Sequence, residues 1–387
     1  MILGNLRSSL ARELDRFFEA LNDGSRVPTD SALCQARLKV LPETFSDLNR
    51  MVVERYYDEG PVERLGEFRL LTVDGSTVRL RGVKAKCAEL FAGDSGWDAE
   101  SGTPLARISF CHDILNDITL DAAIAPYRES EQALAAGHVQ QLGAGDLLMM
   151  DRNYPCYRLF CDLDHRGVKF CARIKVKQWT RLLGDFLESG EVDRTIEWEP
   201  NSRQRAECED LEIAVGTLKL RLVKIVLNTG EIEVLITNLL DRQLWSVERL
   251  GGLYSLRWGA EEQYKLSKVR SEMERWSGKS DRAVEQDFHG RVLLQNLSSI
   301  LSWEARSVVQ SQTSDCWYQY QVNRTRALSI TRSMLYALLC MPQKIVELFE
   351  GLIENYSRKP CPIRPGRKYP RSFRPKADFS FPYKAFA

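Results

Sequence analysis

The segment YSLRWGAEEQYKLSK carries a tyrosine, an arginine, a glutamate and two lysines at spacings that could support chemistry. On a helix with about 100° per residue, four of these side chains fall within roughly a 60° sector: Tyr254, Arg257, Glu261 and Lys268. Lys265 lies beside this stripe. The stripe is too charged for a core and could hold phosphate oxygens around one carboxylate. The alternative is a solvated face, because Glu261 and Lys265 have the i,i+4 spacing of an ordinary surface pair.

Two aspartates share a context, because each follows a buried apolar run. Asp74 follows LLTV and Asp151 follows LLMM. Ligands of open α/β sheets bind outside the carboxyl ends of the strands, so both side chains could face one site. Each aspartate also has a simpler interpretation. Asp74 and Gly75 could form a hairpin turn, and Asp151 could cap a helix that starts at Pro155.

Glu261 and the two aspartates together make a set of hard oxygen donors, which is what Mg²⁺ prefers. A pair of such ions could activate the attacking oxygen and stabilise the leaving oxygen of an in-line phosphoryl transfer. Arg257 and Lys268 would then hold phosphate oxygens. Tyr254 would donate a hydrogen bond to phosphate or stack on a base.

The elements that must position these residues begin with a helical region. Residues 1–60 predict three helices, with Thr29 among the residues that could cap the second: LRSSLARELDRFFEAL, SALCQARLKV and ETFSDLNRMVVERYYDE. Three short helices could form a helix-turn-helix DNA reader. They could equally form a plain helical subdomain, and the sequence leaves both interpretations open.

From Phe68 the hydrophobic period changes to that of strands. FRLLTVDGSTVRL predicts two strands joined at Asp74-Gly75, and later strands alternate with helices, which indicates an α/β domain built on a mixed sheet. Residues 190–240 are rich in strands, with a predicted hairpin at Asn228-Thr229-Gly230. Residues 244–348 are again helical in pattern.

The bulk composition is that of a soluble globular protein of two or three domains, with 387 residues, 44% hydrophobic and 28% charged residues and a net charge of +1. No apolar run approaches the roughly 18 residues of a membrane helix, and charges interrupt the N-terminus too early for a signal peptide. Ten cysteines without framework spacing indicate a reducing cytosol. The nearest set to a zinc site is Cys156, Cys161, His165 and Cys171, for which free buried thiols are the simpler interpretation.

The C-terminal segment is unusual in charge. Residues 351–387 contain nine Lys or Arg, two acidic residues and six prolines, which predicts an extended chain. It could bind phosphates or act only as a solubilising tail.

At this point the motifs resemble a known family. Tyr254-x2-Arg257-x3-Glu261-x6-Lys268 is similar to the Y-R-E-K signature of the insertion-sequence-four family of bacterial DDE transposases. VDGST and MMDRNY resemble the two aspartate motifs of that family, and the resemblance covers roughly residues 5–345. It implies an α/β fold with a ribonuclease-H-like mixed sheet core, a β-rich insertion and helical N- and C-terminal regions. The implied boundaries are a DNA-binding region 1–62, a catalytic domain 63–176 and 241–345, an insertion 177–240 and a basic tail 346–387.

The resemblance also implies an activity. Asp74, Asp151 and Glu261 would bind two Mg²⁺ ions per active site, with Mn²⁺ as a substitute, for cleavage at transposon ends and transfer of the freed 3′-hydroxyl into target DNA. The DNA contacts would come from five residues: Tyr254, Arg257, Trp258, Lys265 and Lys268. Trp258 would stack on a displaced base. Its alternative is a core tryptophan on the other face of the helix.

The expected partners are the terminal inverted repeats and the target DNA, with a homodimer in the synaptic complex, no membrane, and a cytoplasmic, nucleoid-associated location. The early start of the helical region and the proline-rich basic tail depart from the family pattern, in the parts of the chain expected to serve end recognition and assembly. Two alternatives stay open. A Holliday-junction-type nuclease with the same core would cut without joining, and a catalytically silent protein would bind ends without metal.

Overall fold

The structure is a computed structural model, and it describes four ranges of the chain: residues 9–21, 26–176, 179–226 and 230–364. The chain divides into two compact units. The sheet unit comprises residues 57–81 and 85–265, and the helical unit comprises residues 1–56, 82–84 and 266–387. None of the helices in the described ranges has the length and apolar character that crossing a bilayer requires.

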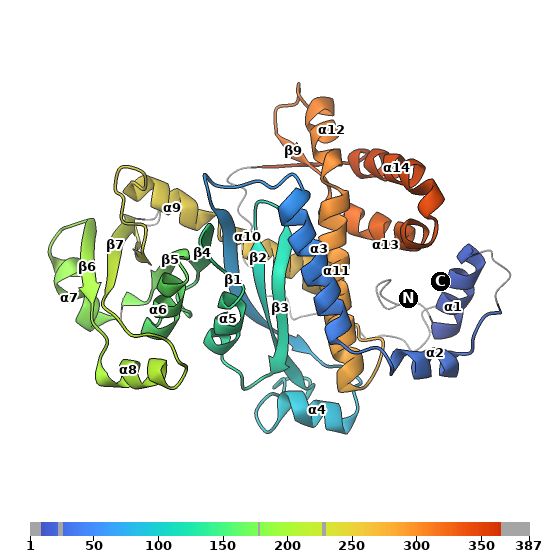
Figure 1. Ribbon diagram of the computed structural model, residues 1–387, viewed down its shortest axis with the longest axis horizontal. Coiled ribbons are helices and arrows are strands. Elements are labelled where there is room, and N and C mark those ends of the chain that lie inside the picture. Colours follow the sequence, from blue (N-terminus) through green and yellow to red (C-terminus); the bar gives the residue numbers. More distant parts are fainter. Residues whose placement is uncertain (1–8, 22–25, 177–178, 227–229, 365–387) are drawn as a thin grey trace. The chain divides into compact units, whose positions relative to one another are not determined.

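The sheet unit is built on one sheet, whose described strands follow the order β3-β2-β1-β4-β5-β8-β7-β6 (Figure 1). β1, β4 and β5 are parallel to one another, and the other neighbouring strands pair antiparallel. The strand bounds are as follows: β1 Arg69–Arg79, β2 Leu105–Asp113, β3 Ile118–Pro126, β4 Asp146–Met150, β5 Lys169–Ile174, β6 Asp193–Trp198, β7 Leu218–Val226 and β8 Ile232–Thr237.

Seven helices of the described residues accompany this sheet; α5 leads from β3 into β4, and α6 connects the parallel strands β4 and β5. Their bounds are as follows: α4 Ala85–Ala92, α5 Glu131–Val139, α6 Tyr157–His165, α7 Thr180–Glu188, α8 Ser202–Glu209, α9 Val247–Ser255 and α10 Trp258–Lys265. All five residues of β4 are buried. A parallel strand covered on both faces is largely apolar, which explains the run LLMM that precedes Asp151. The first residue of β4, Asp146, is buried in an ion pair with Arg69 at 2.6 Å. The predicted mixed α/β fold class is confirmed.

One local prediction is wrong. Asp74 and Gly75 do not form a hairpin turn, because β1 runs through both residues and pairs with β2 from Leu71 to Arg79. The glycine serves close packing instead. A Cβ atom at Gly75 would lie 2.7 Å from the Cγ atom of Glu131 on α5. The strand therefore continues past the end of its neighbour β4, and Asp74 is a strand residue.

The strand-rich segment after residue 190 extends the same sheet. β8 pairs with β5, and β7 and β6 follow outward (Figure 1). β7 and β8 pair antiparallel from Arg221↔Thr237 to Val226↔Ile232, as a hairpin requires. Of the predicted turn, Asn228 and Thr229 lie outside the described residues. Arg221 is buried and holds the sheet edge, because its guanidinium pairs with Asp193 at 2.7 Å and donates to the Trp245 carbonyl at 2.7 Å.

The helical unit begins with the three predicted helices, α1 Leu10–Leu21, α2 Asp30–Arg37 and α3 Glu43–Glu59. Their existence is confirmed. Thr29 caps α2 as expected, because its side chain accepts a hydrogen bond from the Ala32 N–H at 3.2 Å. Such a cap satisfies one of the unpaired N–H groups of the first helical turn.

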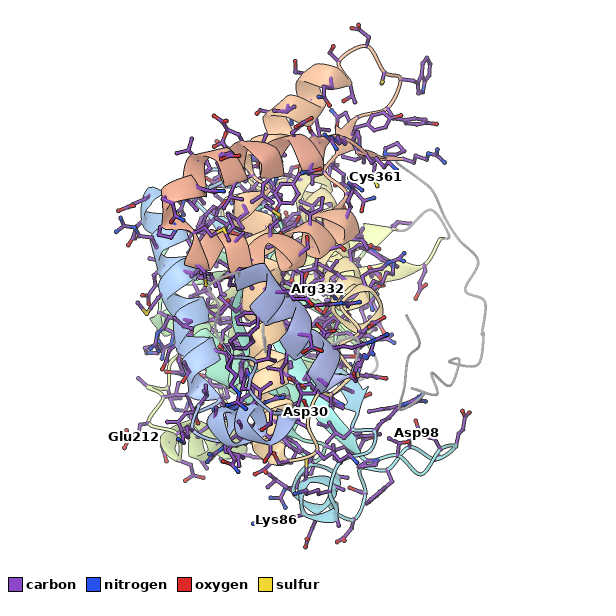
Figure 2. All side chains as sticks on the ribbon, turned by 90° about the vertical axis from the view of Figure 1, so that its right-hand side faces the viewer. Asp30, Lys86, Asp98, Glu212, Arg332 and Cys361 are labelled. Atoms are coloured by element: carbon purple, nitrogen blue, oxygen red, sulfur yellow. The ribbon has the colours of Figure 1, made fainter. Side chains whose placement is uncertain are left out.

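The remaining elements of the helical unit follow the sheet unit in sequence: the π-helix η3 Leu266–Arg270, α11 Asp281–Leu301, α12 Glu304–Gln312, β9 Tyr320–Gln321, α13 Arg324–Cys340, the 3₁₀ helix η4 Pro342–Lys344, α14 Ile345–Ser357 and β10 Cys361–Pro362. Figure 2 shows α13 and α14 side by side, with Arg332 of α13 and Cys361 of β10 labelled.

The extended conformation predicted from residue 351 is wrong for its first part. Residues 351–357 continue α14, and Leu352 and Tyr356 are buried in a cluster with Val309 of α12 and Ala327 of α13. These apolar side chains at i,i+4 spacing outweigh the basic and proline-rich composition that follows. The part of the tail after Arg364 lies outside the described residues.

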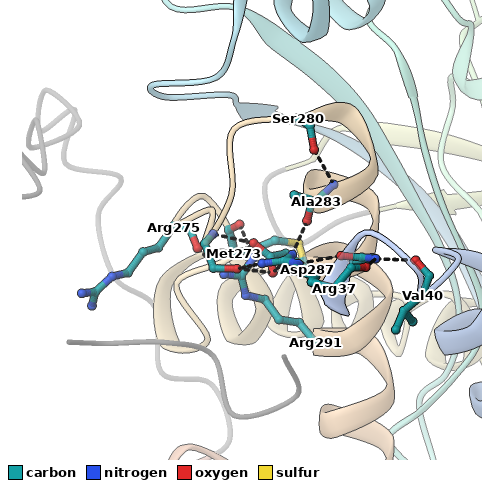
Figure 3. Close-up of polar contacts among 10 residues, drawn as sticks. Arg37, Val40, Met273, Arg275, Ser280, Ala283, Asp287 and Arg291 are labelled. Carbon is teal, nitrogen blue, oxygen red and sulfur yellow. Dashed lines mark hydrogen bonds and ion pairs between the residues drawn. The ribbon is translucent and has the colours of Figure 1, made fainter. Parts of the chain in front are cut away.

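A buried ion pair joins α2 to α11 within the helical unit (Figure 3). The Arg37 guanidinium lies 2.8 Å from the Asp287 carboxylate and also donates to Gln286 at 2.6 Å and to the Ala283 carbonyl at 2.9 Å. Asp287 also accepts from Ser277. Arg37 is the cation that pairs with Asp287. Removing the arginine would therefore leave the charge of a buried carboxylate uncompensated.

We expect Arg37→Met to lower the free energy of unfolding by about 3 kcal/mol, the usual cost of breaking a buried pair by removing one partner. The matched control is Arg50→Met, because Arg50 pairs with Asp47 on the surface of α3 at 2.9 Å. An exposed pair contributes about 0–1 kcal/mol. Urea unfolding of the two variants measures the difference, and equal losses would contradict the role of Arg37.

Candidate active site

Asp74 and Asp151 lie at the carboxyl end of the ladder that joins the neighbouring parallel strands β1 and β4. This end of the ladder is called the sheet edge below. The last pair of the β1–β4 ladder is Val73 with Met150, so the two aspartates are the next residue on each strand. Residues at equivalent positions on parallel neighbours point to the same face. The structure therefore places the two predicted carboxylates side by side.

The environment of Asp74 opposes its ionisation. Burial, with a smaller contribution from the charges of Asp151 and Glu131, raises the pKa of Asp74 to about 6. The Gly75 N–H, which donates to Asp74 Oδ1 at 3.0 Å, and the charge of Arg257 act in the opposite direction. A carboxyl group in this setting gains from any additional cation.

Asp151 is compensated by an arginine that the sequence analysis missed. Arg173 Nη2 lies 3.2 Å from Asp151 Oδ1, and the same guanidinium pairs with Glu233 of β8. The signal was available in the strand pattern. β5 aligns Ala172 with Met150, so Arg173 is level with Asp151 at the end of the next parallel strand. Asp151 does not cap α6, whose N-cap residue is Cys156.

The stripe does not lie on one continuous helix, and that prediction is wrong. Tyr254 lies in the last turn of α9 and Glu261 lies on α10. Arg257 lies in the turn between the two helices. The turn is closed by tight i→i−3 hydrogen bonds, such as Arg257 N–H to the Tyr254 carbonyl at 3.1 Å. Gly259 permits the close approach that follows, because a Cβ atom there would lie 2.7 Å from Ile114 Cγ2.

Although the helix is broken between α9 and α10, Arg257 still pairs with Glu261. Their closest side-chain atoms are 3.6 Å apart, and the Arg257 guanidinium lies 5.8 Å from the centre of the Tyr254 ring. The surface pair that could have explained Glu261 is not formed, because Lys265 pairs with Glu262 instead. Arg257 is only 12% exposed, so its charge acts in a partly desolvated setting.

α10 is anchored to the strand that carries Asp74. The Tyr264 hydroxyl donates to the main-chain carbonyl of Asp74 at 2.6 Å, and its ring packs on Phe110 of β2 with centroids 4.9 Å apart. Gln263 donates to Thr119 of β3 at 3.2 Å. The sequence analysis gave Tyr264 no role. This anchor holds the helix of Glu261 over the strand of Asp74.

The other predicted contacts are placed as follows. Trp258 is 56% exposed, so its alternative interpretation as a core tryptophan is wrong. Lys265 is exposed on α10. Lys268 lies on the π-helix η3, which belongs to the helical unit. The structure therefore brings Tyr254, Arg257 and Glu261 together within the sheet unit.

Several buried donors near these residues have no protein partner. The hydroxyl groups of Tyr154 and Tyr254 and the Nε atoms of Arg173 and Arg257 are buried without a hydrogen bond. Burial, followed by the charges of Asp74 and other carboxylates, raises the pKa of Tyr154 well above its usual range. Unpaired buried donors are costly, so the site suits a ligand with several acceptor oxygens.

The donor set of Asp74, Asp151 and Glu261 fits a hard divalent cation by its chemistry, because all three are carboxylates. The fit by geometry is partial. Across the part of the chain that the structure describes, no three His, Cys, Asp or Glu side chains are gathered closely enough to hold a metal ion. Cys156, Cys161 and Cys171 are free cysteines, of which Cys161 and Cys171 are buried and Cys156 is half-buried.

Comparison with known proteins gives three findings. Residues 66–297 match the family described as the transposase DDE domain. The chain is 21% identical over 344 residues to the transposase InsG of insertion sequence element IS4 from Escherichia coli (strain K12), which covers 88% of this chain and 75% of that protein. The resemblance to the insertion-sequence-four family is confirmed by these two matches.

The third finding is a solved structure of lower similarity. A cryo-EM structure of a piggyBac transposase synaptic complex with hairpin DNA matches 75% of this chain with a TM-score of 0.40 and 13% identity. This chain spans 57% of the length of that one.

We expect the ionisation of Asp74 to lower the stability of the metal-free protein as the pH rises from about 4 to about 6. Burial raises the pKa of Asp74 from 3.8 to about 6, so in that window the folded state holds a proton that the unfolded chain releases. Asp74→Asn binds no such proton and should lose this part of the slope. Urea unfolding at several pH values without divalent cations tests this, and identical slopes would contradict it.

Proposed function

Because this chain belongs to the transposase DDE domain family, we propose that it cleaves the ends of its own element and joins the freed 3′-hydroxyl to target DNA. The observation that supports this most is the position of the two aspartates. Asp74 and Asp151 leave adjoining parallel strands at one sheet edge, and the helix of Glu261 is hydrogen-bonded to the strand of Asp74.

Asp74, Asp151 and Glu261 would hold two Mg²⁺ ions, or Mn²⁺ in their place. Such ions supply Lewis-acid activation and neutralise charge on both oxygens of an in-line displacement. The raised pKa of Asp74 is consistent with this role, because a buried carboxylate that lacks a full counter-charge favours cation binding. Arg173 and Arg257 compensate Asp151 and Glu261 when no other cation does so.

The neighbouring donors would bind the scissile strand. Arg257 and Tyr254 present a guanidinium and a hydroxyl with unpaired buried donors, and phosphate oxygens satisfy both kinds of donor. Arg173, which pairs with both Asp151 and Glu233, would be able to reach phosphate with the nitrogen that now contacts Asp151 if that carboxylate held a metal ion. Trp258 is exposed beside Arg257, so its ring can stack on an unpaired base. Lys265 and Lys268 would add phosphate contacts.

DNA ends, target DNA and a second copy of the chain are the proposed partners. Residues 1–62 would contact DNA, and residues 346–387 would add positive charge. Two ends must be paired before joining, which favours a symmetric dimer with one active site for each end. The nuclease alternative needs no phosphate-binding stripe for retaining a cut end. The silent-binding alternative leaves the three carboxylates without a purpose.

Strand transfer tests the proposal directly. The protein, Mg²⁺, a labelled duplex carrying the terminal repeat of the element and a supercoiled target plasmid should yield joined product. We expect Glu261→Gln to lower cleavage and joining by at least about a hundredfold while DNA binding persists, since metal ions supply several kcal/mol of transition-state stabilisation. Glu262→Gln is the matched control, because that neighbour is exposed and pairs with Lys265.

Each result has a definite meaning. Loss of joined product in Glu261→Gln with normal joining in Glu262→Gln supports the assignment of Glu261. Normal cleavage by Glu261→Gln would remove Glu261 from the site. Cutting without joining by the unaltered protein would favour the nuclease alternative, and binding without cutting would favour the silent one.

Lys268→Ala should weaken binding to the terminal repeat and reduce its dependence on salt. Each phosphate that a lysine neutralises contributes about 0.9 to the slope of log K against log [salt]. Binding isotherms at several salt concentrations measure this slope for both proteins. An unchanged slope would show that Lys268 contacts no phosphate.

A further inference from the structure

A chain of buried polar side chains runs from α5 across β2 to the main-chain carbonyl of Asp74. His138 lies between two partners, with Nδ1 2.6 Å from Asp121 Oδ2 and Nε2 3.0 Å from Ser109 Oγ. Ser109 Oγ in turn lies 3.1 Å from the carbonyl oxygen of Asp74. Ser109 is fully buried and His138 is 1% exposed. The Tyr264 hydroxyl is a second donor to the same carbonyl, at 2.6 Å.

The positions of the protons follow from the atoms involved. A carbonyl oxygen can only accept, so Ser109 must donate its single proton to Asp74. Ser109 Oγ therefore accepts from His138, and Nε2 carries a proton. The carboxylate of Asp121 also accepts, so Nδ1 carries a proton as well. With all three hydrogen bonds formed, His138 is an imidazolium paired with Asp121.

The residue types are those of a nucleophilic Ser-His-Asp triad, but the arrangement is different. In such a triad the histidine accepts the serine proton, and the hydroxyl faces substrate. Here the serine proton points away from His138, and Ser109 is inaccessible. The chain can therefore orient a group and cannot attack one.

The group that it orients is one peptide plane. The carbonyl of Asp74 and the N–H of Gly75 belong to the same planar unit. Ser109 and Tyr264 hold the oxygen end of this plane, and the N–H end donates to Asp74 Oδ1 at 3.0 Å. Fixing the plane therefore fixes the direction in which the Asp74 carboxylate faces the sheet edge.

We propose that Ser109, with His138 and Asp121 behind it, and Tyr264 are positioning residues that set the carboxylate of Asp74 for cation binding. This inference rests on the proposed function, in which Asp74 is a metal ligand. Tyr264 gives the arrangement a second consequence. Its helix carries Glu261, so one carbonyl links the orientation of Asp74 to the placement of α10.

Binding of Mn²⁺ to the DNA-free protein, measured by electron paramagnetic resonance, tests this apart from activity. Residues that orient metal ligands typically change metal affinity by about 10–100-fold when altered, so Ser109→Ala and Tyr264→Phe should each weaken binding about tenfold. His138→Gln should do the same. Ser302→Ala is the matched control for Ser109→Ala, because Ser302 is a buried serine of the helical unit whose hydroxyl donates to the Ser299 carbonyl at 3.2 Å. Its Mn²⁺ affinity should be unchanged.

A second measurement, by nuclear magnetic resonance, distinguishes the proposed hydrogen-bond chain from a role of His138 in packing alone. Correlation of the imidazole nitrogens with their protons should show His138 protonated at both nitrogens in the metal-free protein. Tyr264→Phe keeps the ring that packs on Phe110, so it remains informative should Ser109→Ala fold poorly. A neutral His138 would overturn the proton assignment, and with it the role of His138.

The reference variant Asp74→Ala separates the two possible failures. If it abolishes Mn²⁺ binding while Ser109→Ala and Tyr264→Phe bind as the unaltered protein does, the positioning role is overturned and the proposed metal site stands. If Asp74→Ala binds Mn²⁺ normally, the proposed metal site fails and the positioning role fails with it.

Discussion

The end of the parallel ladder between β1 and β4 is the constraint on which the site depends. The last residues paired in this ladder are Val73 and Met150, and the next residue of the chain after each is an aspartate. The same edge continues to β5, where Arg173 is level with Asp151. Because the three strands are fixed by main-chain hydrogen bonds, two carboxylates and a guanidinium are brought together without any flexible connection.

Bringing carboxylates together has an electrostatic cost, and the sheet unit meets it in two ways. Asp151 and Glu261 are each paired with an arginine, at 3.2 and 3.6 Å. Asp74 is left with a raised pKa, since burial outweighs the influence of Arg257. In the proposed function, divalent cations would take over the carboxylates and phosphate oxygens would take over the arginines, so the same charges serve the free and the bound protein.

The break between α9 and α10 has a physical reason in packing. Near the start of α10, Gly259 packs closely against Ile114. Near its end, the Tyr264 hydroxyl donates a hydrogen bond to the carbonyl of Asp74. The turn still leaves Arg257 near Tyr254 and Glu261, so the chemical grouping survives although the helix that predicted it does not.

Local pattern alone was sufficient for a large part of this protein. Apolar runs ending in Asp74 and Asp151, helical periodicity in residues 10–59 and the spacing of Tyr254, Arg257 and Glu261 are properties of short segments. The mixed α/β class was therefore predictable, and the three carboxylates could be named as candidates. Tertiary structure alone decided that Gly75 lies within a strand, that Arg173 pairs with Asp151 and that Ser109 and Tyr264 meet at one carbonyl. These features depend on strand order and on contacts between segments far apart in the chain, which periodicity and spacing do not encode.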